Sequence, residues 1–138
     1  MSQLLKIATI LPYKENYTFL KAQAAAIWVC DFFKYSKFKE NNYIFGNTKG
    51  SDYLTKNYIN ININNLKSKF SSSTNEYCKN FIKKTKNDKF DIIEIHNRPL
   101  VFNYLKKEID SKYILYFHND PLSMNGSKTI NERLKLLD

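Results

Sequence analysis

Both histidines of this 138-residue chain occur in the same short motif, His-Asn-x-Pro. The first copy is His96-Asn97-Arg98-Pro99, and the second copy is His118-Asn119-Asp120-Pro121. Imidazole accepts or donates a proton near neutral pH, while amide, guanidinium and carboxylate groups hydrogen-bond to hydroxyls or anions. These residue types can therefore hold a polar substrate and move a proton on it.

Each copy of the motif follows a run of residues that predicts a strand, Asp91–Ile95 and Tyr113–Phe117. Between the two strands, Pro99 stands where a first helical turn tolerates proline, and apolar residues after it recur at helical spacing. A strand, a helix and a second strand form a βαβ unit with parallel strands. Because the loops at the carboxyl ends of parallel strands share one edge, we expect both motifs to line one crevice.

A simpler interpretation of the repeat stays open. His and Asn are common turn residues, and proline ends a strand or begins a helix, so each motif can be a turn and nothing more. Two histidines and Asp120 are too few ligands at metal-binding spacing, so we expect no metal and no cofactor. The repetition itself favours the crevice, because both histidines fall at predicted strand ends.

Three further strands are predicted in the first half of the chain. They are Leu4–Leu11, Tyr43–Phe45 and Tyr58–Ile63. The last of these alternates apolar and polar residues with period two, which is typical of a strand near a sheet edge.

Helices are predicted between these strands. Phe19–Tyr35 is apolar on nearly all faces and is expected to be a buried helix. Two later helices begin at Ser73 and Thr129, each with a glutamate three residues on, at capping-box spacing. The alternation indicates an α/β fold, a doubly wound, mainly parallel, Rossmann-like sheet, in one domain over residues 1–138.

The charge is strongly basic, with 22 Lys and Arg against 13 Asp and Glu, a net charge of +9. The lysines are scattered, and only Arg98 and Arg133 offer the guanidinium that base readout favours, so we expect no nucleic-acid partner. A peripheral contact with an anionic membrane stays open. No stretch reaches the roughly 20 apolar residues of a membrane span, and Cys30 and Cys78 form no disulfide framework or zinc motif. We expect a cytoplasmic protein, peripheral at most to the inner face of the membrane.

Loops that bind nucleotides are usually rich in glycine, whereas this chain has three glycines and neither a G-x-G-x-x-G nor a P-loop motif. The loop after the first strand, with Tyr13 and Lys14, nevertheless stands in the right place to meet a ligand. Gln23 and Ala24 belong to a run of small residues, Ala22–Ala26. That run either lets a ligand approach the backbone or packs a helix closely on the sheet.

In this order the motifs resemble the N-terminal, acceptor-side domain of GT-B glycosyltransferases. The resemblance is to the family 4 retaining enzymes of bacterial surface-polysaccharide and lipopolysaccharide assembly. It covers essentially the whole chain in element order and is specific in its last two motifs. It is carried by Lys6–Ala8 before the Pro12 loop, Lys21–Ala26, Asp91–Pro99, and Tyr116–Pro121 with Glu132-Arg133 behind it.

The resemblance implies transfer of a sugar from a nucleotide-sugar donor to a glycan or lipid-linked acceptor, with retention at the anomeric carbon. His118 matches a strand-end histidine near the donor sugar, and Asn119 and Asp120 match the adjacent loop. The run Ala22–Ala26 matches a loop, usually glycine-rich, beside the donor phosphates. His118 and Asp120 are accordingly the catalytic candidates. The substrate-binding candidates are Tyr13, Lys14, Gln23, Ala24, His96, Asn97, Arg98 and Asn119.

The same resemblance implies a partner, the C-terminal domain of a longer parent chain, which holds the nucleotide and a pair of glutamates. The isolated chain is then expected to be inactive, because transfer needs both substrates positioned and the leaving phosphate stabilised. The alternative is a stand-alone α/β ligand-binding or regulatory module without catalysis. A basic nucleic-acid-binding domain is the third hypothesis.

Overall fold

Strands and helices alternate along the chain in the structure, a computed structural model that describes residues 4–64 and 72–138. The strands are β1 (Ile7–Ile10), β2 (Asn42–Gly46), β3 (Tyr58–Asn60), β4 (Ile92–His96) and β5 (Lys112–Tyr116). The helices are α1 (Ala24–Tyr35), α2 (Ser73–Lys84), α3 (Pro99–Glu108) and α4 (Ile130–Leu137), with short 3-10 turns at Lys39–Asn41 and Pro121–Ser123.

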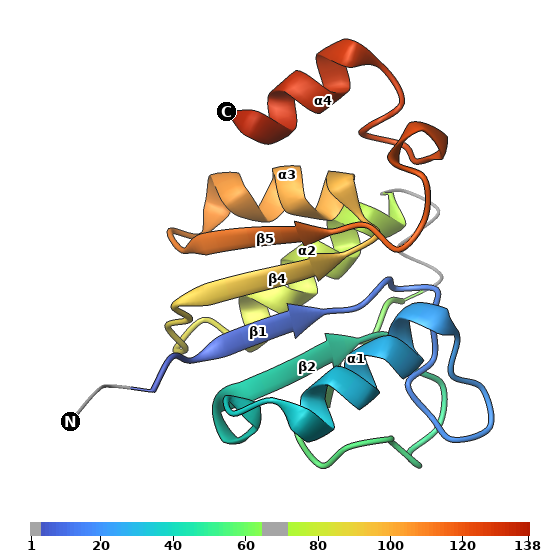
Figure 1. Ribbon diagram of the computed structural model, residues 1–138. Helices are drawn as coiled ribbons and strands as arrows, with labels where there is room; N and C mark the ends of the chain where they lie inside the picture. Colours follow the sequence, from blue (N-terminus) through green and yellow to red (C-terminus); the bar gives the residue numbers. More distant parts are fainter. Residues whose placement is uncertain (1–3, 65–71) are drawn as a thin grey trace.

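The five strands form one sheet in the order β3-β2-β1-β4-β5, and every neighbouring pair is parallel (Figure 1). This confirms the expected α/β, doubly wound class. The chain runs outward from β1 to β3 and then returns to place β4 on the other side of β1. Strand order therefore reverses between β1 and β4, and in such sheets ligands bind outside the carboxyl ends at this point.

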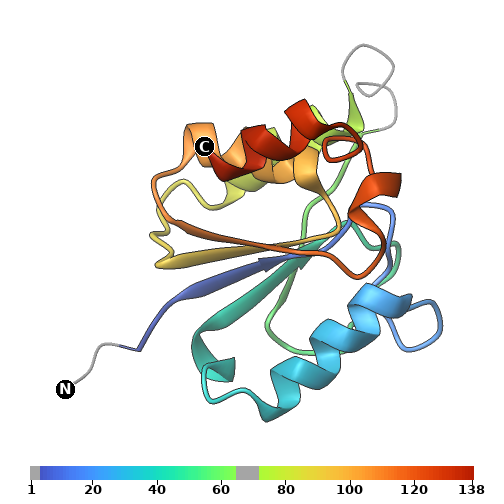
Figure 2. The same ribbon diagram turned by 45° about the horizontal axis from the view of Figure 1, so that its top comes forward.

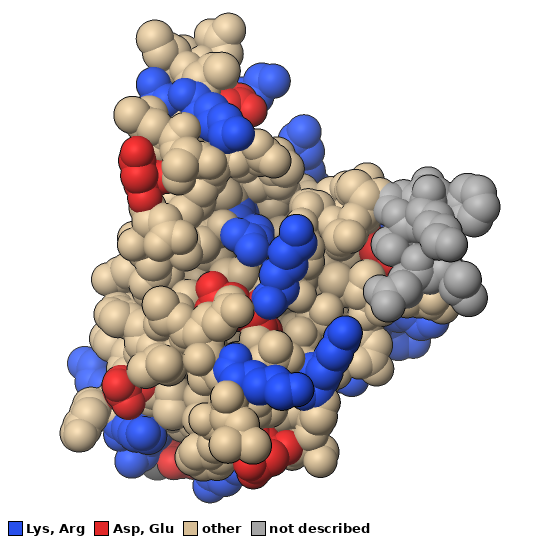
Figure 3. Space-filling view, turned by 90° about the vertical axis from the view of Figure 1, so that its right-hand side faces the viewer, with Lys and Arg blue, Asp and Glu red and all other residues tan. Residues whose placement is uncertain are grey.

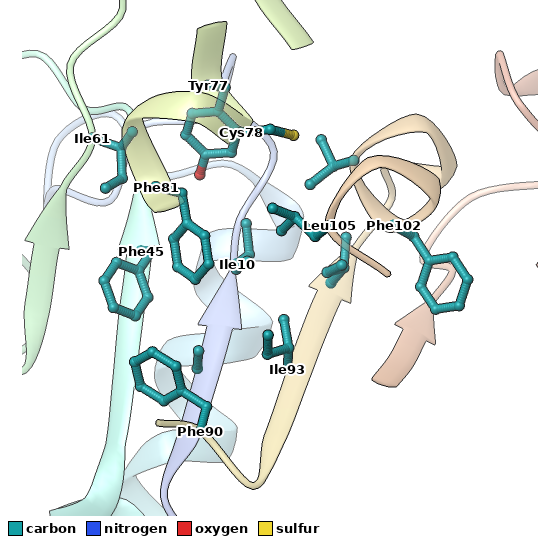
Figure 4. Packing of buried hydrophobic residues seen from close by; sticks show 13 residues of the cluster. Ile10, Phe45, Ile61, Tyr77, Cys78, Phe81, Phe90, Ile93, Phe102 and Leu105 are labelled. Carbon is teal, nitrogen blue, oxygen red and sulfur yellow. The ribbon is translucent and has the colours of Figure 1, made fainter. Parts of the chain in front are cut away.

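Helices cover both faces of the sheet, with α1 on one face and α2 and α3 on the other (Figure 2). All four residues of β1 are buried, which explains why its sequence does not alternate between apolar and polar residues. The polar one, Thr9, donates its hydroxyl to Asn42 Oδ1 at 2.9 Å. On the α2 and α3 face, Phe45 packs edge-on against Phe81 and Phe90, in the same buried cluster as Ile10 and Ile93 (Figure 4). Fully burying each such side chain contributes about 1.5–3 kcal/mol.

The first helix is shorter and less buried than predicted. It begins at Ala24 instead of Phe19, because the segment before it is held in isolated bridges, including one from Thr18 to Tyr53. Phe19 and Leu20 are exposed there. The outer face of α1 is also exposed and apolar, so the expectation of a helix buried on nearly all faces was wrong.

One of the two predicted helix caps is confirmed. Thr129 and Glu132 form both bonds of a capping box at the start of α4. At α2, however, the cap is Ser72, whose hydroxyl accepts from the Asn75 amide, and not Ser73. In the described part of the chain, no helix has the length and apolar character needed to cross a membrane.

Candidate functional site

A cavity of about 430 Å³ opens at the carboxyl edge of the sheet, where the strand order reverses. Five predicted site residues line it: Tyr13 and Lys14 after β1, Asn97 and Arg98 after β4, and Asn119 after β5. The other described residues of the wall are Thr74, Pro99, Leu100, Ser123, Met124, Asn125 and Lys128. We call this the basic cavity. Figure 3 looks onto this edge and shows several Lys and Arg side chains near its middle, with some Asp and Glu atoms beside them.

Arg98 is held in place on the wall of the basic cavity. Its Nη1 donates to the carbonyl of Asn97 at 2.8 Å. Its guanidinium carbon lies 5.4 Å from the ring centroid of Tyr13, a cation–π contact between the two loops. The guanidinium therefore meets a ligand with much of its conformational freedom already lost.

Asn97 connects the ends of the two histidine-bearing strands. It has a φ of 52°, in the left-handed region that asparagine adopts more readily than most residues. Its side-chain oxygen accepts from the backbone amides of His118, at 2.7 Å, and Asn119, at 3.4 Å. The second residue of the first motif thus positions the first two residues of the second motif.

The side chains of the two histidines are hydrogen-bonded to each other. His96 Nδ1 lies 2.7 Å from His118 Nε2, and His96 Nε2 lies 2.5 Å from Glu94 Oε1. The donor and acceptor roles in these two bonds depend on the tautomers of the rings. When Glu94 is ionised and both rings are neutral, the carboxylate accepts from His96 Nε2 and His96 Nδ1 accepts from His118 Nε2. In that state His118 Nδ1 is a hydrogen-bond acceptor.

Trp28 of α1 packs against this histidine pair. Its ring centroid lies 5.7 Å from that of His96 and 5.3 Å from that of His118. His96 is fully buried, whereas His118 is half-buried. Burial and then the neighbouring His96 lower the pKa of His118, and Glu94 partly opposes this. His118 therefore stays neutral to a lower pH than an ordinary histidine.

The lowered pKa predicts that acid destabilises the fold through His118. Its contribution to the free energy of unfolding is complete above the ordinary pKa of 6.5 and is lost as pH falls through the lowered pKa. Chemical unfolding from about pH 8 to about pH 5 measures this dependence. His118→Gln should weaken the pH dependence of the free energy of unfolding. If the variant shows the same pH dependence as the wild type, the prediction is contradicted.

The remaining candidates lie outside the basic cavity. Gln23 precedes the first turn of α1 without a side-chain cap, and Ala24 is exposed beside it. The amide of Ala26 donates to Glu15 Oε2 at 3.2 Å, so a carboxylate occupies the helix terminus that the resemblance assigns to donor phosphates. Asp120 accepts from the amide of Leu122 at 2.9 Å and thereby caps the turn that begins at Pro121.

Three residues of the site were not predicted from the sequence. Glu94 had a usable signal, because it lies two positions before His96 in a strand and so faces the same side of the sheet. No comparable pattern in the sequence indicated Glu15 or Trp28. Burial raises the pKa of Glu15, and the hydrogen bond from the Ala26 amide and then the charge of Arg98 partly oppose this rise.

Metal-ligand geometry and comparison with known proteins do not identify a function for this site. Among residues 4–64 and 72–138, no group of three or more His, Cys, Asp or Glu is arranged to hold a metal ion. Comparison with known proteins found no matching family model, no matching curated protein and no matching solved structure. The geometry of the site itself therefore has to support any functional conclusion.

Proposed function

We propose that this chain is the N-terminal, acceptor-side domain of a retaining GT-B glycosyltransferase. The proposed reaction moves a sugar from a nucleotide-sugar donor to a glycan or lipid-linked acceptor. One observation carries the proposal. Both His-Asn-x-Pro motifs lie at the carboxyl edge of a parallel sheet, joined through His96 and His118, beside a polar cavity at the switch in strand order.

The basic cavity is the proposed acceptor site. Its volume of about 430 Å³ falls within the range of small-molecule sites, and most of its wall is polar. Arg98, Lys14 and Asn119 supply charged and amide donors for hydroxyl or anionic groups. His118 directly precedes Asn119, and its Nδ1 is the acceptor that can take a hydrogen bond or a proton from a substrate hydroxyl.

The donor nucleotide is assigned to the C-terminal domain of a longer parent. A net charge of +9 also supports peripheral contact between the cytoplasmic protein and an anionic membrane that carries a lipid-linked acceptor. Each assignment follows from the proposed family and fails with it.

A second candidate is a binding module without catalysis. It is favoured by Glu15, whose carboxylate fills the start of α1 where donor phosphates would otherwise approach. A negative charge there stabilises the helix terminus and repels phosphate. The two candidates differ in whether a bound sugar is transferred.

Transfer is tested with the protein made from its complete reading frame. It is incubated with a panel of nucleotide sugars and with glycan or lipid-linked acceptors, and nucleoside diphosphate release is measured. We expect release that depends on the acceptor, and a product whose anomeric configuration by NMR matches that of the donor. Sugar binding without transfer would favour the binding module, and failure to bind any sugar would contradict both candidates.

A further inference from the structure

The wall of the basic cavity is positively charged. Lys14, Arg98 and Lys128 line it, and none of the described residues on its wall is acidic. The three cations come from separate segments, after β1, after β4 and before α4. None of them forms an ion pair with a carboxylate in the described part of the chain.

Acidic side chains in the neighbouring segments are already engaged with backbone amides. Asp120 accepts from Leu122, and Glu132 accepts from Thr129 and Gly126. Glu15 accepts from Ala26, although its pKa also responds to the charge of Arg98. These carboxylates therefore stabilise turns and helix starts, and they leave the cations of the cavity available to a ligand.

Neutral donors complete the wall. The side-chain amides of Asn119 and Asn125 have no hydrogen-bond partner among residues 4–64 and 72–138. Helix α3 begins at the cavity with Pro99 and Leu100, and Arg98 provides no side-chain cap there. The positive end of its dipole adds to the three side-chain charges.

We infer that the basic cavity binds a phosphate group carried on a sugar, so that the acceptor is a phosphorylated saccharide. Arg98 keeps one Nη1 bond to Asn97 and has further N–H groups for two phosphate oxygens, while Lys14 and Lys128 act as point charges. As an acceptor assignment this rests on the proposed function. As an anion site it stands on the cavity alone.

Calorimetric titration of the chain with glucose 1-phosphate, inorganic phosphate, diphosphate and glucose tests the inference. We expect glucose 1-phosphate to bind at least about tenfold more tightly than glucose, since a charge-assisted hydrogen bond contributes about 1.5–3 kcal/mol. If inorganic phosphate or diphosphate binds as tightly as glucose 1-phosphate, the claim that the cavity recognises a sugar is overturned.

Variants locate the binding. Arg98→Gln and Lys128→Gln should each weaken the binding of glucose 1-phosphate about tenfold or more. Arg98→Lys should bind it more tightly than Arg98→Gln does, because the positive charge is kept. Lys112→Gln is the matched control, because this exposed lysine begins β5 at the opposite edge of the sheet. Equal losses in the control and the cavity variants would mean binding to the general positive surface and would overturn the inference.

The two proposals can fail separately. Phosphate binding in the cavity without any sugar transfer would leave the anion site intact and contradict the glycosyltransferase. Transfer to an acceptor without phosphate, at an unchanged rate in Arg98→Gln, would leave the glycosyltransferase intact and overturn this inference. Circular dichroism and thermal midpoints establish that each variant is folded before its affinity is compared.

Discussion

Replacing His118 with alanine is expected to lower the turnover number of the proposed full-length transferase by about 10²–10⁴-fold. The imidazole of His118 has a ring nitrogen that can accept a proton from a substrate hydroxyl near neutral pH. His118 Nε2 is hydrogen-bonded to His96, which Glu94 holds in turn, and the His118 backbone amide donates to Asn97. These bonds orient the imidazole before substrate arrives. Initial rates at saturating donor and acceptor measure the effect.

Two further variants separate chemistry from folding. His118→Ala leaves His96 Nδ1 buried without its partner, which costs about 1–3 kcal/mol, so its stability must be measured as well. Glu94→Gln keeps both rings and removes the charge that raises the pKa of His118. It should move the acid limb of the pH–rate profile to lower pH. A wild-type rate in folded His118→Ala would contradict the proposed role.

Replacing Asn97 with alanine is expected to destabilise the fold by about 2–4 kcal/mol. The alanine would have to hold a left-handed backbone conformation, which costs about 1 kcal/mol for a residue with a β-carbon. It would also remove the acceptor of the His118 and Asn119 amides. The free energy of unfolding in urea at neutral pH measures the loss.

Two substitutions at the same position separate these causes. Asn97→Gly accepts the left-handed backbone and loses only the side-chain acceptor, whereas Asn97→Asp keeps an acceptor oxygen. We expect aspartate to cost least, glycine more and alanine most. If glycine and alanine cost the same, backbone conformation contributes nothing measurable at this residue.

The fold class was predictable because apolar runs and helical periodicity alternate along the whole chain. The convergence of the two motifs was predictable for the same reason, since parallel strands place Asn97 and Asn119 at one edge whatever their side chains do. The resemblance to a sugar-transferring family supplied roles for these residues, and those roles stay predictions.

Details set by tertiary contacts were not predictable. The apolar residues before α1 favoured a helix that begins at Phe19, but the pairing of Thr18 with Tyr53 holds this segment in another conformation. Similarly, no local pattern indicates that Glu15 reaches the amide of Ala26. The bond between His96 and His118 requires the exact side-chain directions at two strand ends, which spacing alone does not define.

Trp28 is the single tryptophan of the chain, and it touches both imidazoles. Indole emission is quenched by a nearby imidazolium, so the protein carries its own optical reporter of the charge on that pair. No label has to be attached, and no second fluorophore of this type contributes background. The packing of Trp28 against the histidine pair thus makes the protonation of the pair measurable by intrinsic fluorescence.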